Sequence, residues 1–216
     1  MEQFPGIPDR SLEACGDFVA DPFLRDWAMA TLVGDGPLHN PDHWHLRFAS
    51  LLFVWAPTTF RSQGRVVVGT AQLGKQQGAN GKREFLEWSY ARLNGGELPD
   101  FVVTLCAPWF QDRLLDMDGR AVCAVIDHEL YHCGQEVDPV FGVPKFTKAG
   151  LPKFAVRGHD VEEFVGVAAR WGAWSEGLEQ FRQALNNPQF PAGSRRDRGL
   201  GLEAVCGCGA LVRSTI

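Results

Sequence analysis

Two histidines and a glutamate in this sequence have the spacing of a metal-binding helix. The segment Ile126–Cys133 reads IDHELYHC, so His128 and His132 are four residues apart and Glu129 follows the first histidine. Four residues turn a helix by about 400°, so both imidazoles point the same way, one turn apart. Two such ligands beside a carboxylate that can activate water are what a metal-dependent hydrolase needs. The segment predicts a zinc site with Glu129 as general base.

A hydrolytic zinc site also needs a third protein ligand, because one coordination position must stay open for water. His159, in the segment RGHDVEEF, is the first candidate, since a hairpin between two helices could return the chain to the site. Glu162 or Glu163 is the alternative ligand; both could instead cap a helix or lie in solvent, and His159 could be purely structural. Asp160 could orient a ligand imidazole without touching the metal.

Other residues of metal-binding type do not form a complete motif. His39, His43 and His45 are close together before an apolar run, and we expect a polar loop there in preference to a second metal site. Cys206 and Cys208 supply two ligands, which is too few for a structural zinc site. The six cysteines are expected to be reduced thiols, because a secreted disulfide framework would be denser.

The elements that would position these residues predict an α+β fold. Asp21 and Pro22 are residue types that often begin a helix. Apolar residues at i, i+3, i+4 spacing continue up to the histidine motif, which predicts a second helix there. The predicted helices are 23–33, 118–133 and 160–185, the last with Asp160 and Glu163 at capping-box spacing. Apolar or β-branched runs predict strands at 46–56, 65–73 and 100–107. A hairpin is expected over 140–157, and 84–93 could be a helix or a strand.

Charge and hydropathy argue against nucleic acid and membranes as partners. The net charge of -5 argues against a broad basic surface that would bind nucleic acid. No apolar run reaches the length of about 18 residues that suggests a membrane-spanning helix, so no membrane partner is expected. Residues 1–10 are polar and lack the pattern of a secretory signal, which predicts a cytoplasmic protein.

Three stretches resemble the putative phage metallopeptidase family: DFVVTLCAPWF, CAVIDHELYHC and KFTKAGLPKFAVRGHDVEEF, in this order. The matching motifs run over about 46–181. The resemblance implies a minimal zincin-like fold, in which a small sheet packs against the active-site helix and a hairpin and a C-terminal helix follow. It carries over His128, Glu129, His132 and His159, but it supplies no substrate. With it, the chain divides into an irregular segment 1–20, a zincin-like domain 21–187 and a cysteine-bearing tail 188–216.

The sequence therefore predicts a zinc metallopeptidase that acts on a protein or peptide, in the host cytoplasm if the gene belongs to a phage. The alternative is a metal-stabilised binding protein that sequesters a host factor without catalysis. Hydrolysis of a non-peptide amide is a third interpretation. The presence of Glu129 favours catalysis, because a structural metal site does not need a base. No particular oligomeric state is predicted.

Overall fold

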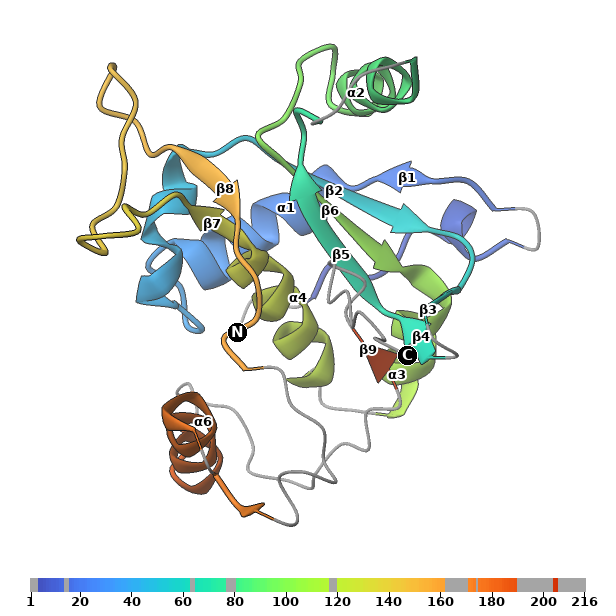
Figure 1. Ribbon diagram of the computed structural model, residues 1–216. Helices are drawn as coiled ribbons and strands as arrows, with labels where there is room; N and C mark the ends of the chain where they lie inside the picture. The colour runs from blue at the N-terminus through green and yellow to red at the C-terminus, as the bar shows by residue number, and fades with distance from the viewer. Residues whose placement is uncertain are drawn as a thin grey trace, which may run out of the picture.

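The computed structural model has the predicted α+β fold, and it is built around a four-stranded sheet (Figure 1). It describes residues 4–13, 16–62, 65–76, 81–116, 120–161, 171–173, 175–189 and 204–205. The α-helices are α1 (Pro22–Ala28), α2 (Gly81–Leu93), α3 (Ala107–Asp116), α4 (Arg120–His132) and α6 (Glu176–Asn186). Shorter helical segments are Asp9–Ser11, Met29–Val33 and Pro41–Phe48. The strands are β1 (Val19–Ala20), β2 (Leu51–Ala56), β3 (Phe60–Ser62), β4 (Arg65–Val67), β5 (Gly69–Leu73), β6 (Phe101–Cys106), β7 (Cys133–Gln135), β8 (Phe154–Val156) and β9 (Ala204–Val205).

The main sheet has the strand order β1-β2-β6-β5. Its two central strands, β2 and β6, are parallel, while β1 and β5 run antiparallel to their neighbours. All six residues of β2 are buried, which explains why its sequence is a continuous apolar run. β3, β4 and β9 form a second sheet, and β7 and β8 form a third.

Helices cover both faces of the main sheet. Phe53 and Trp55 of β2 point into the larger core, which also contains residues of α1 and α4. Leu52 and Val54 point the other way and pack with Tyr90 of α2. Figure 1 shows α2 and α4 on opposite sides of the sheet. The side-chain alternation of a strand thus divides one apolar run between two cores, and α4 is held against β5 at the edge.

The predicted helix start at Asp21 is confirmed. Asp21 caps α1, where one carboxylate oxygen accepts from the Leu24 amide at 2.9 Å. Its other oxygen accepts from the Trp55 indole at 2.8 Å. One buried carboxylate therefore begins the helix and ties it to the sheet.

Two predicted strands are only partly correct. The strand expected over 46–56 begins later, because Pro41–Phe48 is a 3-10 segment capped by Asn40, whose side chain accepts from the Asp42 amide at 3.1 Å. The strand expected over 65–73 is split at Val68 into β4 and β5, which belong to different sheets. The strand over 100–107 is confirmed as β6, and the ambiguous segment 84–93 is helical in α2.

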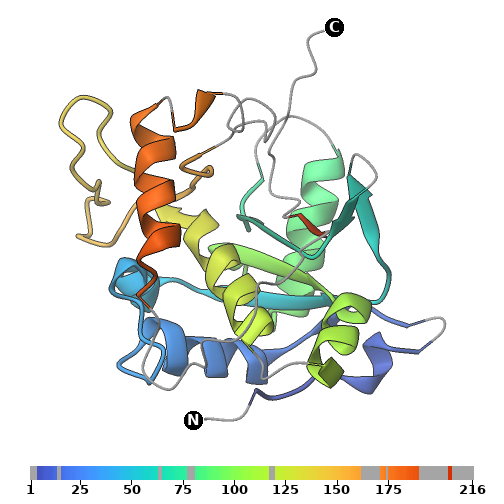
Figure 2. The ribbon, with the colours of Figure 1, turned by 90° about the horizontal axis from the view of Figure 1, so that it is seen from below.

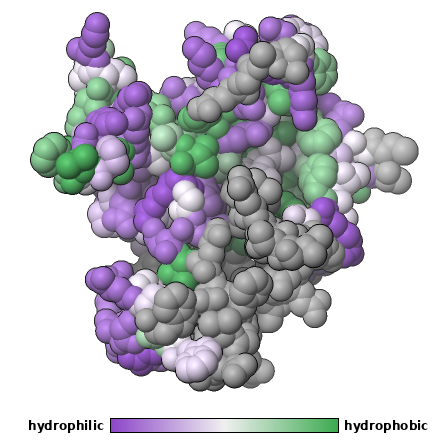
Figure 3. All heavy atoms as spheres, viewed as in Figure 1, coloured by the Kyte–Doolittle hydropathy of each residue, from purple (hydrophilic) through white to green (hydrophobic). Residues whose placement is uncertain are grey.

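The helix before the hairpin is confirmed as α4, and the hairpin is present but begins earlier than the predicted 140–157, because its first strand starts at Cys133. α4 ends at His132, β7 follows without a loop, and β8 pairs back onto it in antiparallel register. The hairpin carries exposed apolar side chains between β7 and β8, including Val140 and Phe141. Figure 3 shows apolar atoms on the part of the molecule that projects at the left, where Figure 1 places this hairpin.

The prediction of a single helix over 160–185 is only partly correct, because α6 forms the last part of that range and the first residues are not helical. Asp160 and Val161 are not helical, and Gly172 has a φ of +69°, a left-handed conformation that stops a helix. α6 begins afterwards, where the Ser175 hydroxyl accepts from the Leu178 amide. Glu163, the partner expected for Asp160 in a capping box, lies outside the described residues. Within the described part of the chain, no helix is long and apolar enough to cross a bilayer.

Candidate metal centre

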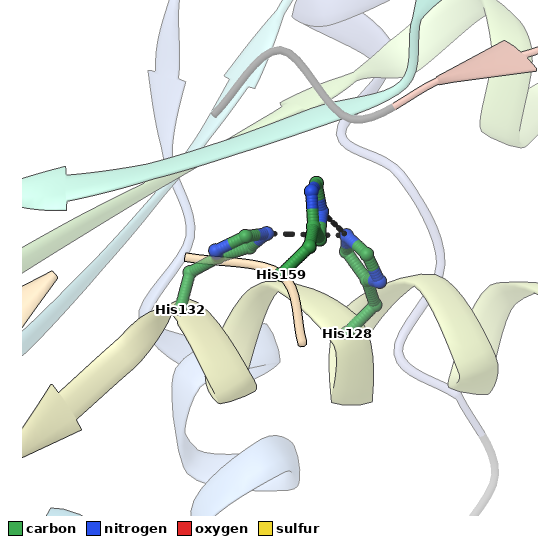
Figure 4. Close-up of side chains that lie close together, drawn as sticks. All are labelled: His128, His132 and His159. Carbon is green, nitrogen blue, oxygen red and sulfur yellow. Dashed lines mark hydrogen bonds between the residues drawn. The ribbon is translucent and has the colours of Figure 1, made fainter. Parts of the chain in front are cut away.

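Three histidine rings converge at one end of α4 (Figure 4). His128 and His132 lie one turn apart on the helix, and His159 reaches them from the segment after β8. The Nε2 atom of His128 is 3.2 Å from Nε2 of His132 and 3.3 Å from Nε2 of His159. One nitrogen from each ring lies within 4.8 Å of the other two. In the part of the chain that the structure describes, this is the one cluster of His, Cys, Asp or Glu that could hold a metal ion.

The hairpin brings His159 to this cluster. β8 returns beside β7 with Val156 opposite Cys133, so the chain re-enters at the end of α4. There the Arg157 amide donates to the His132 carbonyl at 2.9 Å. The Arg157 carbonyl in turn lies 2.6 Å from Nδ1 of the His132 ring. His159 follows two residues later and is therefore placed by the register of the hairpin.

Two of the three nitrogen–nitrogen separations have the length expected at a tetrahedral metal ion. Zinc binds histidine nitrogen at about 2.0–2.1 Å, which places two nitrogens of a tetrahedral site about 3.3–3.4 Å apart. The two Nε2 separations from His128 are close to that value. A carbonyl oxygen can only accept, so Nδ1 of His132 carries its proton and donates to Arg157. This leaves Nε2 of His132 with the lone pair that a metal ion requires.

Burial keeps two of the imidazoles uncharged. Desolvation, followed by the nearby His132 and His159, lowers the pKa of His128 to about 4. Burial also lowers the pKa of His132, although its bond to the Arg157 carbonyl acts in the opposite direction. Both rings are therefore neutral near pH 7, which is the form that binds metal.

Glu129 is buried on the side of α4 that faces β5. Its side chain is 0% exposed, and this desolvation raises the pKa of Glu129 to about 8. The carboxylate fits only because β5 begins with a glycine. A Cβ atom added at Gly69 would be 2.4 Å from Oε1 of Glu129 and 2.9 Å from its Cγ. Gly69 therefore leaves the space that the Glu129 side chain fills.

The histidines before β2 are not in an exposed polar loop, so that prediction is wrong for two of them. His43 and His45 are buried, while His39 is exposed. Nε2 of His43 is 2.8 Å from Oδ1 of Asp127, the residue before His128. Nε2 of His45 is 2.8 Å from the Cys133 carbonyl. These histidines hold the 3-10 segment against α4 and β7.

A cavity of about 620 Å³ opens onto the three histidines. Phe181 of α6 lines it as well. Figures 1 and 2 show α6 on the same side of the main sheet as α4, and Figure 1 shows it set apart from that helix. Tyr131 and Arg157 are two further lining residues that the motif did not identify. The Arg157 guanidinium lies over the Tyr131 ring, 5.6 Å from its centre.

Of the residues that the sequence analysis did not identify, Gly69 has a recognisable sequence pattern, whereas Arg157 and Tyr131 do not. A lone glycine in a β-branched run often marks a close approach by another group, so Gly69 could have been found. Arg157 and Tyr131 have no such mark, because their places depend on the hairpin and on packing around α4. Asp160, named above as a residue that could orient a ligand ring, accepts a hydrogen bond from Arg157 at 2.6 Å.

The alternative ligands and the terminal cysteines fall in other parts of the chain. Glu162, Glu163, Cys206 and Cys208 lie outside the described residues. Cysteines 106, 123 and 133 are free thiols, in agreement with the expectation for these three. Burial raises the pKa of Cys133 well above its usual value, so this residue is an apolar neighbour of the site.

A family model described as "Putative phage metallopeptidase" matches residues 17–186, which is most of the chain. This confirms the resemblance inferred from the three motifs. Searches of the curated proteins and of the solved structures gave no match.

The contact between Gly69 and Glu129 can be tested by a double-mutant cycle. Gly69→Ala should destabilise the protein by about 1–3 kcal/mol, because the added methyl group overpacks a filled site. The same change in a Glu129→Ala background should cost less, with a coupling energy of about 0.5–3 kcal/mol. Denaturant unfolding of the four proteins measures this. Gly81→Ala is the control, because its Cβ would meet only Oε2 of Glu84 at 3.9 Å. Equal costs in both backgrounds would contradict the contact.

The buried carboxyl of Glu129 predicts a pH-dependent stability in metal-free protein. The folded pKa is about 8, above the ordinary value of 4.5, so ionisation is disfavoured in the folded state. The protonated Glu129 makes its full contribution to the free energy of unfolding below pH 4.5, and this contribution is lost as pH rises through 8. Over that range the contribution changes by an amount on the order of 3–5 kcal/mol. Wild type and Glu129→Gln should therefore have similar pH trends below pH 4.5. Above it, wild type should lose stability relative to the variant up to about pH 8.5. Parallel unfolding curves at pH 4.5 and 8.5 would show that Glu129 is not desolvated.

Proposed function

The chain belongs to the putative phage metallopeptidase family, and from this premise we propose that it is a zinc-dependent peptidase with Glu129 as its general base. The observation that carries the proposal is the distance from Nε2 of His128 to Nε2 of His132 and of His159, which matches the edge of a zinc tetrahedron. The same helix also carries the buried carboxyl of Glu129. Three histidines would leave one coordination position for water.

Each residue of the site has a separate part in the proposed reaction. His128, His132 and His159 would hold zinc, which would supply a polarised water and polarise the substrate carbonyl. The Arg157 carbonyl holds the His132 ring in the tautomer that exposes Nε2. Glu129 would take a proton from the attacking water on a carboxylate oxygen and deliver it to the leaving amine.

The electrostatic setting of Glu129 suits this proton transfer. Burial raises its pKa to about 8 without a metal ion. A divalent cation close by would lower that pKa, because an opposite charge favours the ionised form. The two effects oppose each other and bring the pKa towards neutrality, where a group that both accepts and donates a proton works best.

Zinc binding can be measured directly. The protein should hold about one zinc per chain after loading and desalting, and His159→Ala should weaken zinc affinity by about 10-fold or more, since it removes a proposed ligand. The exposed His39→Ala is the matched control and should leave the affinity unchanged. Competition with a chromophoric chelator gives the affinities. Unchanged affinity in His159→Ala would exclude it as a ligand, and two equivalents would point to Cys206 and Cys208.

Catalysis is tested by comparing wild type with Glu129→Gln. Glutamine keeps the volume of the side chain but cannot accept the proton, so hydrolysis should fall by about 10²–10⁴-fold while zinc content stays the same. Glu84→Gln, an exposed change on α2, should cleave like wild type. Mass spectrometry of new termini in a randomised peptide library provides the readout. Equal cleavage by Glu129→Gln would exclude it as the base. Zinc-loaded wild type that cleaves nothing would favour a binding protein.

A further inference from the structure

One arginine is shared by the two cavities that lie beside the histidines. The first cavity, of about 620 Å³, is lined by the three histidines. The second, of about 460 Å³, extends along β7 and β8. Asp42, Tyr131 and Arg157 line both cavities. Among the described residues that line either one, Arg157 is the only lysine or arginine. A ligand that occupied both cavities would therefore pass this guanidinium.

The position of Arg157 is fixed relative to the candidate metal ligands. Its backbone makes both the amide and the carbonyl contact with His132, at 2.9 and 2.6 Å. The ring of Tyr131 supports its guanidinium. Gly134 leaves room for the start of its side chain, since a Cβ atom added there would be 3.0 Å from Cβ of Arg157. A group bound by Arg157 would thus lie in a defined place relative to the histidines.

The guanidinium is occupied by a partner that a ligand can replace. Nη2 of Arg157 is 2.6 Å from Oδ1 of Asp160, and the two side chains are 47% and 75% exposed. Ion pairs this exposed contribute little to stability, because water screens them and their ordering costs entropy. A carboxylate held from a second direction, by a bound peptide, can compete with Asp160.

We propose that Arg157 binds a carboxylate of the peptide substrate, either a free C-terminus or the side chain of Asp or Glu near the scissile bond. This inference rests on the proposed peptidase function. Both kinds of carboxylate are ionised at neutral pH. The planar guanidinium matches a carboxylate in two parallel hydrogen bonds, which lysine cannot do. Asp160 holds the guanidinium in place until the substrate arrives.

The experiment measures binding and cleavage with the same probes. Four fluorescein-labelled pools of pentapeptides carry Glu or Gln at the centre and a free or amidated C-terminus, with the other positions randomised among uncharged residues. Anisotropy with full-length, zinc-loaded Glu129→Gln gives the dissociation constants. One acid-bearing pool should bind about 10-fold or more tightly than its neutral twin, since hydrogen bonds to charged groups are strong. The Glu/Gln and acid/amide comparisons identify which carboxylate is bound.

Two substitutions, each added to Glu129→Gln, connect this preference to Arg157. Arg157→Gln should abolish it while binding of the neutral pool changes less than about 3-fold. Asp160→Asn should strengthen binding of the acidic pool by about 2–5-fold, because it removes the competing partner. Arg182→Gln is the matched control, since Arg182 is also an exposed arginine paired with an acid three residues away. If Arg157→Gln does not fold, Asp160→Asn decides alone, and the absence of tightening overturns the proposal.

The outcomes separate this inference from the proposed function. No binding to any pool, no acid preference, or a preference that survives Arg157→Gln overturns the carboxylate site. Arg157→Gln in an otherwise wild-type chain that lowers kcat equally on acidic and neutral peptides also overturns it, because Arg157 would then act at the reacting carbonyl. An acid preference that depends on Arg157, in a protein whose wild type cleaves none of the pools, supports the carboxylate site and removes the peptidase function. Cleavage of the pools without an acid preference supports the peptidase function and overturns the carboxylate site.

Discussion

The candidate metal centre depends on the pair of hydrogen bonds between His132 and Arg157. One bond joins the two backbones, and the other holds the imidazole of His132 by the Arg157 carbonyl. Together they close the hairpin at the point where α4 ends and place His159 two residues beyond. A slip of one residue in the β7-β8 register would turn every following side chain to the other face. The register therefore decides whether the third histidine reaches the first two.

The packing of α4 against β5 imposes the second constraint, because it buries a carboxyl. Glu129 is 0% exposed, and the backbone of β5 comes close enough that only glycine fits at position 69. Desolvation of an ionised carboxylate is costly, so the folded protein raises its pKa and keeps the proton in the absence of metal. The close fit thus fixes the position of the side chain and adjusts its proton affinity at the same time. A larger residue at position 69 would disturb both.

Local spacing was enough to predict that two of the clustered histidines share one face of a helix, and contacts between residues far apart in the chain account for what it missed. His128 and His132 follow from the period of a helix, and the start of α1 follows from the types of Asp21 and Pro22. The split of 65–73 into two strands in different sheets has no local signal beyond Gly69. The burial of His43 depends on Asp127, which is 84 residues away in the chain. The place of Arg157 depends on the hairpin register, which spacing alone does not determine.

The candidate site combines buried or half-buried ionisable groups, Glu129 and His128, with an exposed charged group, Arg157. Burial favours the neutral form of any ionisable group, so it raises the pKa of Glu129 and lowers that of His128. Both changes leave the groups without charge near pH 7, which spares the core an unpaired ion and leaves His128 ready to bind a cation. The Arg157 side chain is exposed instead, so water solvates its charge and screens its ion pair with Asp160. Buried neutral groups can hold a metal ion and move a proton, whereas an exposed charge can exchange partners. The fold brings these environments together because Arg157 is hydrogen-bonded to His132 at the end of α4. Glu129 and His132 are buried, whereas the Arg157 side chain is exposed.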